Sequence, residues 1–341
     1  MEALSVDAIP DSEGWQYEPK WDGFRCLIFR DRDKVQLQSK SGQLLERYFP
    51  EIVEAAGVLK PKQFVLDGEL VIPTAKGFAF DSLLMRLHPA ASRVQKLSKE
   101  IPARFIAFDL LVDAKGKSLV NLPLRERRNA LEKFFATNLS SHEIYQLSET
   151  TENLKLAHRW LRGVGTDTDG VIAKRLDAIY ESGERTGAMQ KIKLLRTADC
   201  VVGGFRYAEK GKVVGSLLLG LYGPEGLLHH VGFCSGLKTS ERAALTKKLE
   251  KLIGSPGFTG KAPGGPSRWS TKRLSEWQPL RPKLVVEVGY DHVTGERFRH
   301  GTKLLRWRPD KSPDQCTLLQ LRQKKLGLKR EIVSGLKAEA N

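Results

Sequence analysis

A lysine, a carboxylate, a glycine and an arginine lie within eight residues near the start of the chain, in the segment Glu18–Arg25, which reads Glu-Pro-Lys-Trp-Asp-Gly-Phe-Arg. These residue types can bind a nucleotide phosphate and react with it. Lys20 could attack phosphorus if its amine lost its proton, because an ordinary lysine, with a pKa of about 10.4, is almost entirely ammonium at neutral pH. Burial and neighbouring cations favour the neutral amine, and Arg25 is one such cation. The alternative is a surface hairpin turn, which Asp-Gly often forms between two strands.

Two further apolar segments carry groups that could contact a nucleotide. Asp67 and Glu69 lie in Val65–Leu70, and carboxylate oxygens suit Mg²⁺ or a ribose hydroxyl. A solvated Asp-Gly turn is the alternative there. Phe108 lies in the apolar run Phe105–Leu111. Its ring could stack on a purine, although core packing is the commoner place for an aromatic side chain in a buried strand.

Charged residues also gather on two later strand candidates. Asp169 opens a predicted strand that carries Lys174 near its end. Lys191 and Lys193 alternate along the chain, so a strand would place both ammonium groups on one face. Paired lysines repel each other unless an anion lies between or above them. A solvated surface strand is the alternative.

The elements that must position these groups alternate between strands and helices from about residue 15 to residue 193, as in an α/β or α+β domain. Short apolar runs predict strands at Arg25–Phe29, Val35–Gln38, Phe64–Leu70, Arg104–Leu111, Ile144–Leu147 and Gly170–Arg175. Helical patterns predict helices at Phe49–Ala56, Phe80–Met85, Leu124–Phe135 and Thr151–Gly163, the last with Thr150 or Thr151 as its N-cap.

After Lys193 the pattern changes to short strands punctuated by glycine, with one helix. Strands are expected at Asp199–Arg206, Val213–Tyr222, Leu227–Gly232 and Leu284–His292, and the helix at Ser240–Leu252. This arrangement suggests a small barrel, and the OB-fold is the commonest nucleic-acid-binding barrel of this size. The Gly- and Pro-rich segment Gly254–Ser267 is expected to be a mobile surface loop. A domain boundary is placed near Leu194–Thr197, and no P-loop motif is present.

The overall composition favours a polyphosphate partner. The 341 residues contain 56 Lys and Arg against 40 Asp and Glu, a net charge of +16 and an isoelectric point near 9.7, which meets the usual electrostatic criterion for a nucleic-acid-binding domain. A basic but otherwise ordinary enzyme is the alternative. Four scattered cysteines without a CxxC pair indicate neither a zinc site nor a disulfide framework. We expect neither a signal peptide nor a membrane span, and a cytoplasmic location.

Taken in order, these segments resemble the motifs of the covalent nucleotidyltransferase superfamily, which contains ATP-dependent DNA ligases, RNA ligases and mRNA capping enzymes. Glu18–Arg25 contains a KxDGxR motif, and its companions are Ser39–Gly42, Leu66–Glu69, Phe108–Leu110, Asp169–Lys174, Lys191–Lys193 and Arg306–Lys311. A chance KxDGxR has odds of about one in a few hundred in a chain of this length. The similarity extends from Trp15 to Lys311 and is strongest to the compact bacterial ligases of the ligase C group.

The resemblance implies a role for each motif residue. Lys20 would attack the α-phosphate of ATP, release pyrophosphate and keep AMP as a phosphoramidate, while Asp22 and Arg25 orient it and bind phosphate. Within the nucleotide, adenine would be contacted by Glu18 and Phe108, the ribose by Glu69, the α-phosphate by Lys191 and Lys193, and other parts by Lys40 and Lys174. Mg²⁺, or Mn²⁺ in its place, would be bound by Glu69 and Asp169. When the second domain closes, the pyrophosphate would be contacted by Arg306, Arg308, Asp310 and Lys311.

Two residues depart from the family pattern. Ligases usually carry Arg in the second motif, where this chain has Lys40, and Glu at the start of the fourth, where it has Asp169. Lysine replaces the planar fork of arginine by a single compact charge, so bidentate phosphate contact is lost. Aspartate is shorter by one methylene, which favours a water-bridged contact with a metal.

By resemblance, residues 1–194 form an α+β adenylation domain, residues 195–316 an OB-fold, and residues 317–341 a basic tail or helix. The expected activity is ATP-dependent sealing of 5′-phosphate/3′-hydroxyl nicks in duplex DNA, in DNA repair, by a monomer that a repair polymerase could accompany. An RNA ligase or a GTP-using capping-type enzyme is the alternative within the superfamily. A non-catalytic OB-fold protein that binds nucleic acid is the alternative outside it.

Overall fold

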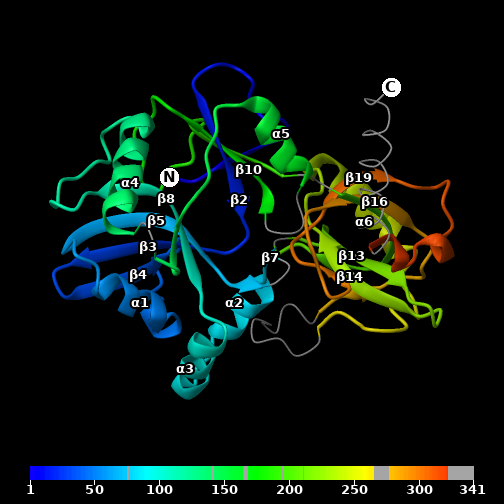
Figure 1. Ribbon diagram of the computed structural model, residues 1–341. Helices are drawn as coiled ribbons and strands as arrows, with labels where there is room; N and C mark the ends of the chain where they lie inside the picture. Colours follow the sequence, from blue (N-terminus) through cyan, green and yellow to red (C-terminus); the bar gives the residue numbers. More distant parts are fainter. Residues whose placement is uncertain are drawn as a thin grey trace, which may run out of the picture. The chain divides into compact units, whose positions relative to one another are not determined.

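The structure is a computed structural model that describes residues 1–74, 77–139, 142–163, 168–193, 196–209, 211–264 and 276–321. It divides into two compact units, Met1–Leu194 and Leu195–Asn341 (Figure 1). The first is α+β and the second is rich in β-strands and similar to an OB-fold. The predicted fold class is therefore confirmed.

The first sheet of the first unit has the order β1-β11-β10-β2, with β1 at Leu4–Val6, β11 at Met189–Ile192, β10 at Thr168–Arg175 and β2 at Trp15–Trp21. Side chains alternate between its two faces. One face carries Tyr17, Val171 and Ile192, which pack in a small core with residues of α5 (Leu154–Arg162). The opposite face carries Glu18, Lys20 and their neighbours, so the period of the strands separates the apolar from the charged groups.

The second sheet has the order β4-β3-β5-β8-β9, with β4 at Lys34–Ser39, β3 at Phe24–Asp31, β5 at Gln63–Val71, β8 at Arg104–Val112 and β9 at Tyr145–Leu147. Its apolar face forms the main core of the unit with residues of three helices, α1 (Pro50–Gly57), α2 (Phe80–Arg86) and α4 (Leu124–Asn138). A short 3-10 helix η1 (Glu46–Tyr48) precedes α1, and β6 (Pro73–Thr74) pairs with β7 (Gly77–Phe78). All strands and helices predicted for this part of the chain are present.

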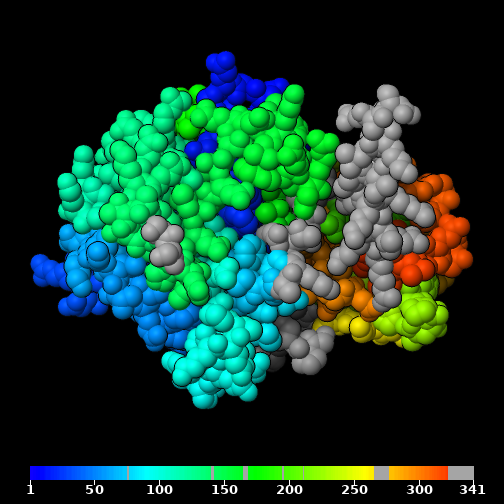
Figure 2. Space-filling view, in the orientation of Figure 1, coloured from blue at the N-terminus to red at the C-terminus, as the bar shows by residue number. Residues whose placement is uncertain are grey.

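Several local features differ from the sequence-based expectations, which did not include the strands β1, β2, β6 and β7. The N-cap of α5 is Asn153, whose side chain accepts hydrogen bonds from the amides of Lys155 and Leu156, so the prediction of Thr150 or Thr151 was wrong. The helix α3 (Ala91–Glu100) was not predicted, because its polar sequence buries only Val94 and Ser98. Figure 2 shows this helix, in cyan, at the surface of the first unit.

The hairpin alternative for the first motif is excluded by the sheet pairing. β2 pairs with β10, whereas β3 pairs with β4 and β5, so Asp22 and Gly23 carry the chain from one sheet to the other. A Cβ atom on Gly23 would lie 2.1 Å from the carbonyl oxygen of Leu70. Only glycine fits this close approach of two backbones.

The buried Arg30 ties β3 to the end of α1. Its side chain is 3% exposed, and it donates to the carbonyl of Ala56, to that of Leu59 at 3.0 Å and to that of Gly57 at 2.7 Å. Arg30→Met should lower the free energy of unfolding by about 2–4 kcal/mol, because it leaves these carbonyls without their donor. Urea titration tests this, with the exposed Lys34→Met as control. Equal midpoints for the two variants would contradict the prediction.

The second unit contains a sheet in the order β14-β13-β12-β16-β19, with β15 on β12, and a hairpin of β17 with β18. The elements are β12 (Arg196–Tyr207), β13 (Val214–Tyr222), β14 (Leu228–Cys234), η2 (Thr239–Glu241), α6 (Arg242–Glu250), β15 (Gln278–Pro279), β16 (Val285–Tyr290), β17 (Val293–Thr294), β18 (Arg297–Phe298), β19 (Lys303–Trp307) and η4 (Pro313–Gln315). Its apolar side chains form a separate core.

Residues 317–321 form hydrogen bonds with strands of the second unit. The amide of Leu318 donates to the carbonyl of Tyr222, and the side chain of Gln320 exchanges hydrogen bonds with the backbone of Asp199. The predicted basic tail from residue 322 onward, and residues 265–267 of the predicted loop, lie outside the described residues. The four cysteines are buried thiols. Within the described ranges, no helix has the length and apolar character needed to cross a membrane.

Candidate active site

A cavity of about 220 Å³ lies in the first unit, lined by residues of both its sheets. Eight of the residues predicted from the motifs line it: Glu18, Lys20, Arg25, Lys40, Glu69, Phe108, Lys174 and Lys191. Segments separated by up to 173 residues in the chain, from Glu18 to Lys191, thus meet at one place. Trp21, Ile172 and Met189 supply apolar surface to the same cavity.

One end of the cavity combines a buried ion pair with an aromatic ring. The ammonium of Lys174 lies 2.8 Å from a carboxylate oxygen of Glu18, and both side chains are at most 6% exposed. The same ammonium lies 4.5 Å from the ring centroid of Phe108. Phe108 faces the cavity, while Phe105 and Ala107 on the same strand belong to the core. The ring is therefore placed to stack on a planar ligand, which core packing would not allow.

A β-bulge aims Asp169 at Lys20. The register of β10 on β2 shifts between Thr168 and Val171, and Gly170 within the shift has φ +144° and a Cβ position only 2.0 Å from the carbonyl oxygen of Ile192. Only glycine is compatible with this backbone, and such bulges commonly redirect a side chain. The carboxylate of Asp169 consequently lies 2.7 Å from the ammonium of Lys20.

Asp169 also forms an ion pair with Lys193, whose ammonium lies 2.7 Å from the same Oδ2 atom. The two lysines are 21% exposed and the carboxylate only 4%. The expectation that paired lysines need an anion between them thus applies to Lys20 and Lys193. Lys191, one residue before the end of β11, lines the cavity instead, where burial lowers the pKa of its ammonium and the charge of Lys193 adds to this effect.

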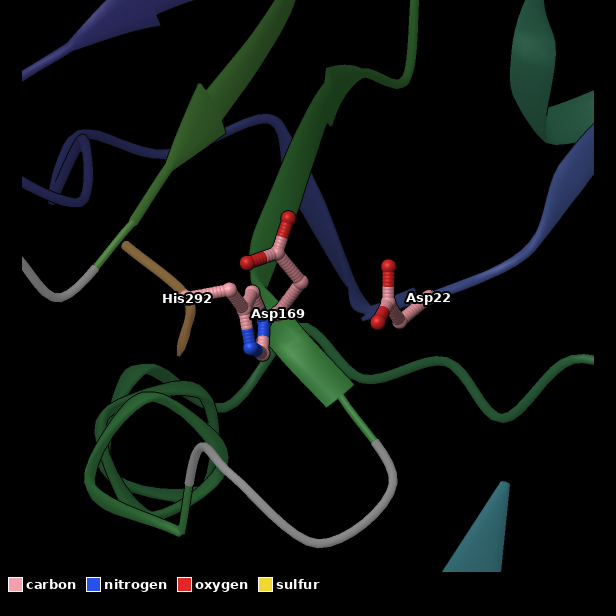
Figure 3. A group of neighbouring side chains, drawn as sticks. All are labelled: Asp22, Asp169 and His292. Atoms are coloured by element: carbon pink, nitrogen blue, oxygen red, sulfur yellow. The ribbon is translucent and has the colours of Figure 1, made fainter. Parts of the chain in front are cut away.

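Asp22 and Asp169 form an acidic pair that fits a divalent cation. Their carboxylate oxygens lie within 4.8 Å of each other, one from the turn after β2 and one from β10 (Figure 3). Oxygen ligands of this kind suit Mg²⁺ and Mn²⁺. His292, also labelled in Figure 3, belongs to the second unit. Sequence reasoning named Asp169 as a metal ligand but gave Asp22 the roles of orienting Lys20 and binding phosphate.

Arg25 forms hydrogen bonds with other groups of the protein. Its guanidinium donates to both carboxylate oxygens of Asp67, at 3.1 and 2.7 Å, and to the carbonyl of Met1 at 2.6 Å. Asp67 is fully buried and also accepts a hydrogen bond from Tyr180 at 2.8 Å. The charge of Arg25 is therefore compensated by Asp67, and the charged group in direct contact with Lys20 is Asp169. This differs from the expectation that Arg25 favours the neutral amine of Lys20.

Glu69 lies next to Lys20 and Arg25 in the cavity wall. Burial raises the pKa of its carboxyl group to about 8, although the charges of Lys20 and Arg25 oppose the shift. The group is therefore mostly protonated at neutral pH. A protonated carboxyl can donate a hydrogen bond to a ribose hydroxyl, but it is a poor ligand for a metal ion.

This raised pKa predicts a pH-dependent stability difference between wild type and Glu69→Gln. Between the unfolded value of 4.5 and about 8, the folded protein holds a proton that the unfolded chain releases. The wild-type free energy of unfolding should thus fall by up to about 5 kcal/mol relative to the variant as pH rises through this window. Urea unfolding at a series of pH values measures it. Parallel pH profiles would contradict the assigned pKa.

The last predicted motif lies on β19 and the turn after it, in the second unit. Arg306 forms an ion pair with Glu287 at 2.6 Å, while Arg308 and Lys311 bind separate oxygens of Asp199 at 2.8 and 2.7 Å. Asp310 contacts Arg308 at 2.8 Å. The three cations of the motif are thus paired with carboxylates of their own unit.

Two residues of the site, Tyr180 and Glu2, were missed from the sequence, and Asp67, which was expected to suit a metal or a ribose, binds Arg25 instead. Asp67 and Tyr180 hold Arg25, and Glu2 holds Lys40 at 3.1 Å. Glu2 and Tyr180 lie in segments without any recognisable pattern, and only the fold brings them to the cavity.

Comparison with known proteins gives consistent results along the whole chain. The family model described as "ATP dependent DNA ligase domain" matches residues 5–193, and that described as "ATP dependent DNA ligase C terminal region" matches residues 210–311. DNA ligase C1 of Mycolicibacterium smegmatis is 44% identical over 332 residues, which cover 94% of this chain and 92% of that protein.

Two further proteins are similar over most of this chain. The multifunctional non-homologous end joining protein LigD of Mycobacterium bovis is 32% identical over 88% of this chain and 37% of its own length. A solved structure of a Lig E DNA ligase has a TM-score of 0.56 at 18% identity, covering 90% of this chain and all of that one. The last similarity concerns the fold alone.

Proposed function

Because this chain belongs to the ATP-dependent DNA ligases, we propose that it seals nicks in duplex DNA by passing AMP from ATP to Nζ of Lys20 and from there to the 5′-phosphate of the nick. The observation that carries this proposal is the position of Lys20, in a cavity with Glu18, Phe108 and Lys191 and in contact with Asp169. The cavity thus combines an amine that can attack phosphorus, a ring on which a planar base can stack and cations that can bind phosphate.

The first step forms one bond and breaks one. The lone pair of Nζ attacks the α-phosphorus of ATP, the bond from that phosphorus to the bridging oxygen of the β-phosphate breaks, and pyrophosphate leaves with the bonding electrons. An ammonium has no lone pair, so Lys20 must first leave its ion pair with Asp169 and release a proton to solvent, to which its side chain is 21% exposed. Lys193 shares the same oxygen of Asp169 and keeps that carboxylate compensated. Lys191 and Lys193 then stabilise charge on the phosphate oxygens.

Two further transfers complete the reaction. The 5′-phosphate of the nick attacks the lysyl-AMP and takes up AMP, and the 3′-hydroxyl then attacks the activated phosphate and expels AMP. We assign Glu18 and Phe108 to adenine, Glu69 to the ribose, and Lys40 and Lys174 to other contacts with the nucleotide. Arg25 has a supporting place in this proposal, because Asp67 holds it against β5.

A divalent cation is part of the proposal. Asp22 and Asp169 offer carboxylate oxygens within 4.8 Å of each other, and a bound Mg²⁺ or Mn²⁺ would offset negative charge on the phosphates. The protonated carboxyl of Glu69 does not favour it as a ligand, so we place the ion at the two aspartates.

The second unit is proposed to bind the leaving pyrophosphate through Arg306, Arg308, Asp310 and Lys311, at a stage when it closes on the nucleotide. We further propose a place in DNA repair for a monomer that acts in the bacterial cytoplasm, with a repair polymerase as the kind of partner expected. The similarity to a protein named for non-homologous end joining supports the repair role.

The test uses the purified chain with Mg²⁺ and α-labelled ATP or GTP, followed by a chase with nicked DNA or nicked RNA. We expect covalent label from ATP alone, removed by nicked DNA with formation of a sealed strand. Label from GTP, or a chase by nicked RNA only, would instead indicate a capping-type enzyme or an RNA ligase.

A further inference from the structure

Glu2 is a second carboxylate that compensates cations of the nucleotide cavity. Its Oε1 atom lies 3.1 Å from the ammonium of Lys40, and its Oε2 atom accepts a hydrogen bond from the guanidinium of Arg185. Its backbone amide donates to the carbonyl of Glu184 at 2.7 Å. Glu2 is thus held by two side-chain contacts and one backbone hydrogen bond, on a segment that none of the recognised motifs includes.

The Glu2–Lys40 ion pair stands where three cavities of the first unit meet. Lys40 and Arg25 line the nucleotide cavity and also two neighbouring cavities of about 580 and 220 Å³. Glu2 lines both neighbours, and the next residue, Ala3, lines the nucleotide cavity itself. The ion pair therefore forms part of the partition between the nucleotide cavity and the space beside it.

Lys40 and Arg185 act on the same electrostatic cluster as the catalytic lysines. Both contribute to the lowered pKa of Lys191, after burial and the charges of Lys193 and Lys20. Hydrogen bonds from Arg185 and Lys40 lower the pKa of Glu2, so its carboxylate stays ionised. The side chain of Glu2 is 25% exposed and each cation 54%, which leaves both cations within reach of an incoming phosphate.

We propose that Glu2, itself held by Arg185, is a positioning residue of the nucleotide site, which holds Lys40 at the edge of the cavity and competes with phosphate for it. The proposal rests on the function proposed above. An anion already paired with a cation must be displaced, or must share it, before a phosphate can bind there. Glu2 therefore lowers the affinity of the site for ATP and for the pyrophosphate that leaves, and it favours release of the product.

The test is the rate of covalent AMP formation against ATP concentration for Glu2→Gln. One net positive charge more at the site should lower the KM for ATP by about 3- to 10-fold at low salt, with no increase in the maximal rate. Added salt should shrink the difference. Pyrophosphate, added as the inhibitor, should bind more tightly to the variant by a similar factor.

Three variants separate this role from a general charge or folding effect. Asp7→Asn removes one negative charge from an exposed residue of the same N-terminal segment and should leave the KM for ATP unchanged. Glu2→Asp keeps the carboxylate, so its KM for ATP should be close to that of the wild type. Lys40→Gln in the Glu2→Gln background should cancel the gain, since the two residues act on each other.

A KM of Glu2→Gln equal to that of Asp7→Asn, or higher than the wild-type value, would overturn the proposal. So would a gain in affinity that survives in the double variant with Lys40→Gln. Failure of the wild-type protein itself to acquire AMP would refute the proposed function as a whole, and the same experiment distinguishes that result from a failure confined to Glu2.

Discussion

Replacement of Lys20 by arginine is expected to abolish ATP-dependent nick sealing, with a rate at least about 10⁴-fold below wild type. Arginine keeps a positive charge that can pair with Asp169, whose carboxylate lies 2.7 Å from the ammonium of Lys20. Its guanidinium does not lose a proton in proteins and has no lone pair to attack phosphorus. Sealing of a labelled nicked duplex over time measures the effect.

A nick that already carries AMP on its 5′-phosphate provides the control for Lys20→Arg. Its closure requires the 3′-hydroxyl as the nucleophile and no lysyl-AMP, so the variant should seal this substrate far faster than it seals a nick supplied with ATP. Covalent AMP on Lys20→Arg, or equal losses on both substrates, would contradict the role of Lys20 as the acceptor.

The second large effect is expected for Arg308→Ala, which should lower the rate of covalent AMP formation by about 10²- to 10³-fold. In the proposed mechanism this guanidinium neutralises charge on the departing pyrophosphate. Closure of a nick that already carries AMP releases no pyrophosphate and should be affected much less. Rapid-mixing measurements of label transfer from ATP, beside closure of the activated nick, give both rates.

Asp199→Asn is the matched control for Arg308→Ala. Asp199 holds both Arg308 and Lys311, so its replacement weakens the same ion pairs while keeping the cations. If Arg308 acts on pyrophosphate, Asp199→Asn should keep most of the rate of AMP transfer. A loss in Asp199→Asn as large as that in Arg308→Ala would mean that Arg308 acts by stabilising the turn after β19.

Much of the site could be predicted from the family motifs, and the structure places several of the motif residues on strands whose side chains alternate between two faces. Glu18 and Lys20 on β2, and Lys174 on β10, share the charged face of their sheet, while Tyr17 and Val171 turn to the core. Because alternate residues of a strand lie on opposite faces, the sequence shows which residues share a face. The family motifs then indicated which of the charged faces belong together.

The pairings between distant residues could not be predicted in the same way. Arg25 was expected to act on Lys20 because the two are five residues apart, but the register of β3 on β5 brings it to the buried Asp67. Glu2 reaches Lys40 because β1 pairs with β11 at the sheet edge. Such contacts depend on strand order and on bulges such as that at Gly170, which local patterns do not encode.

The identity of the residue that carries AMP is the most direct test of the proposed mechanism. The wild-type protein is incubated with ATP and Mg²⁺, digested, and its peptides are mapped by mass spectrometry before and after addition of nicked DNA. We expect AMP on Nζ of Lys20, absent once the nick is sealed. AMP on any other residue, or a sealed nick with no covalent AMP at any time, would contradict it.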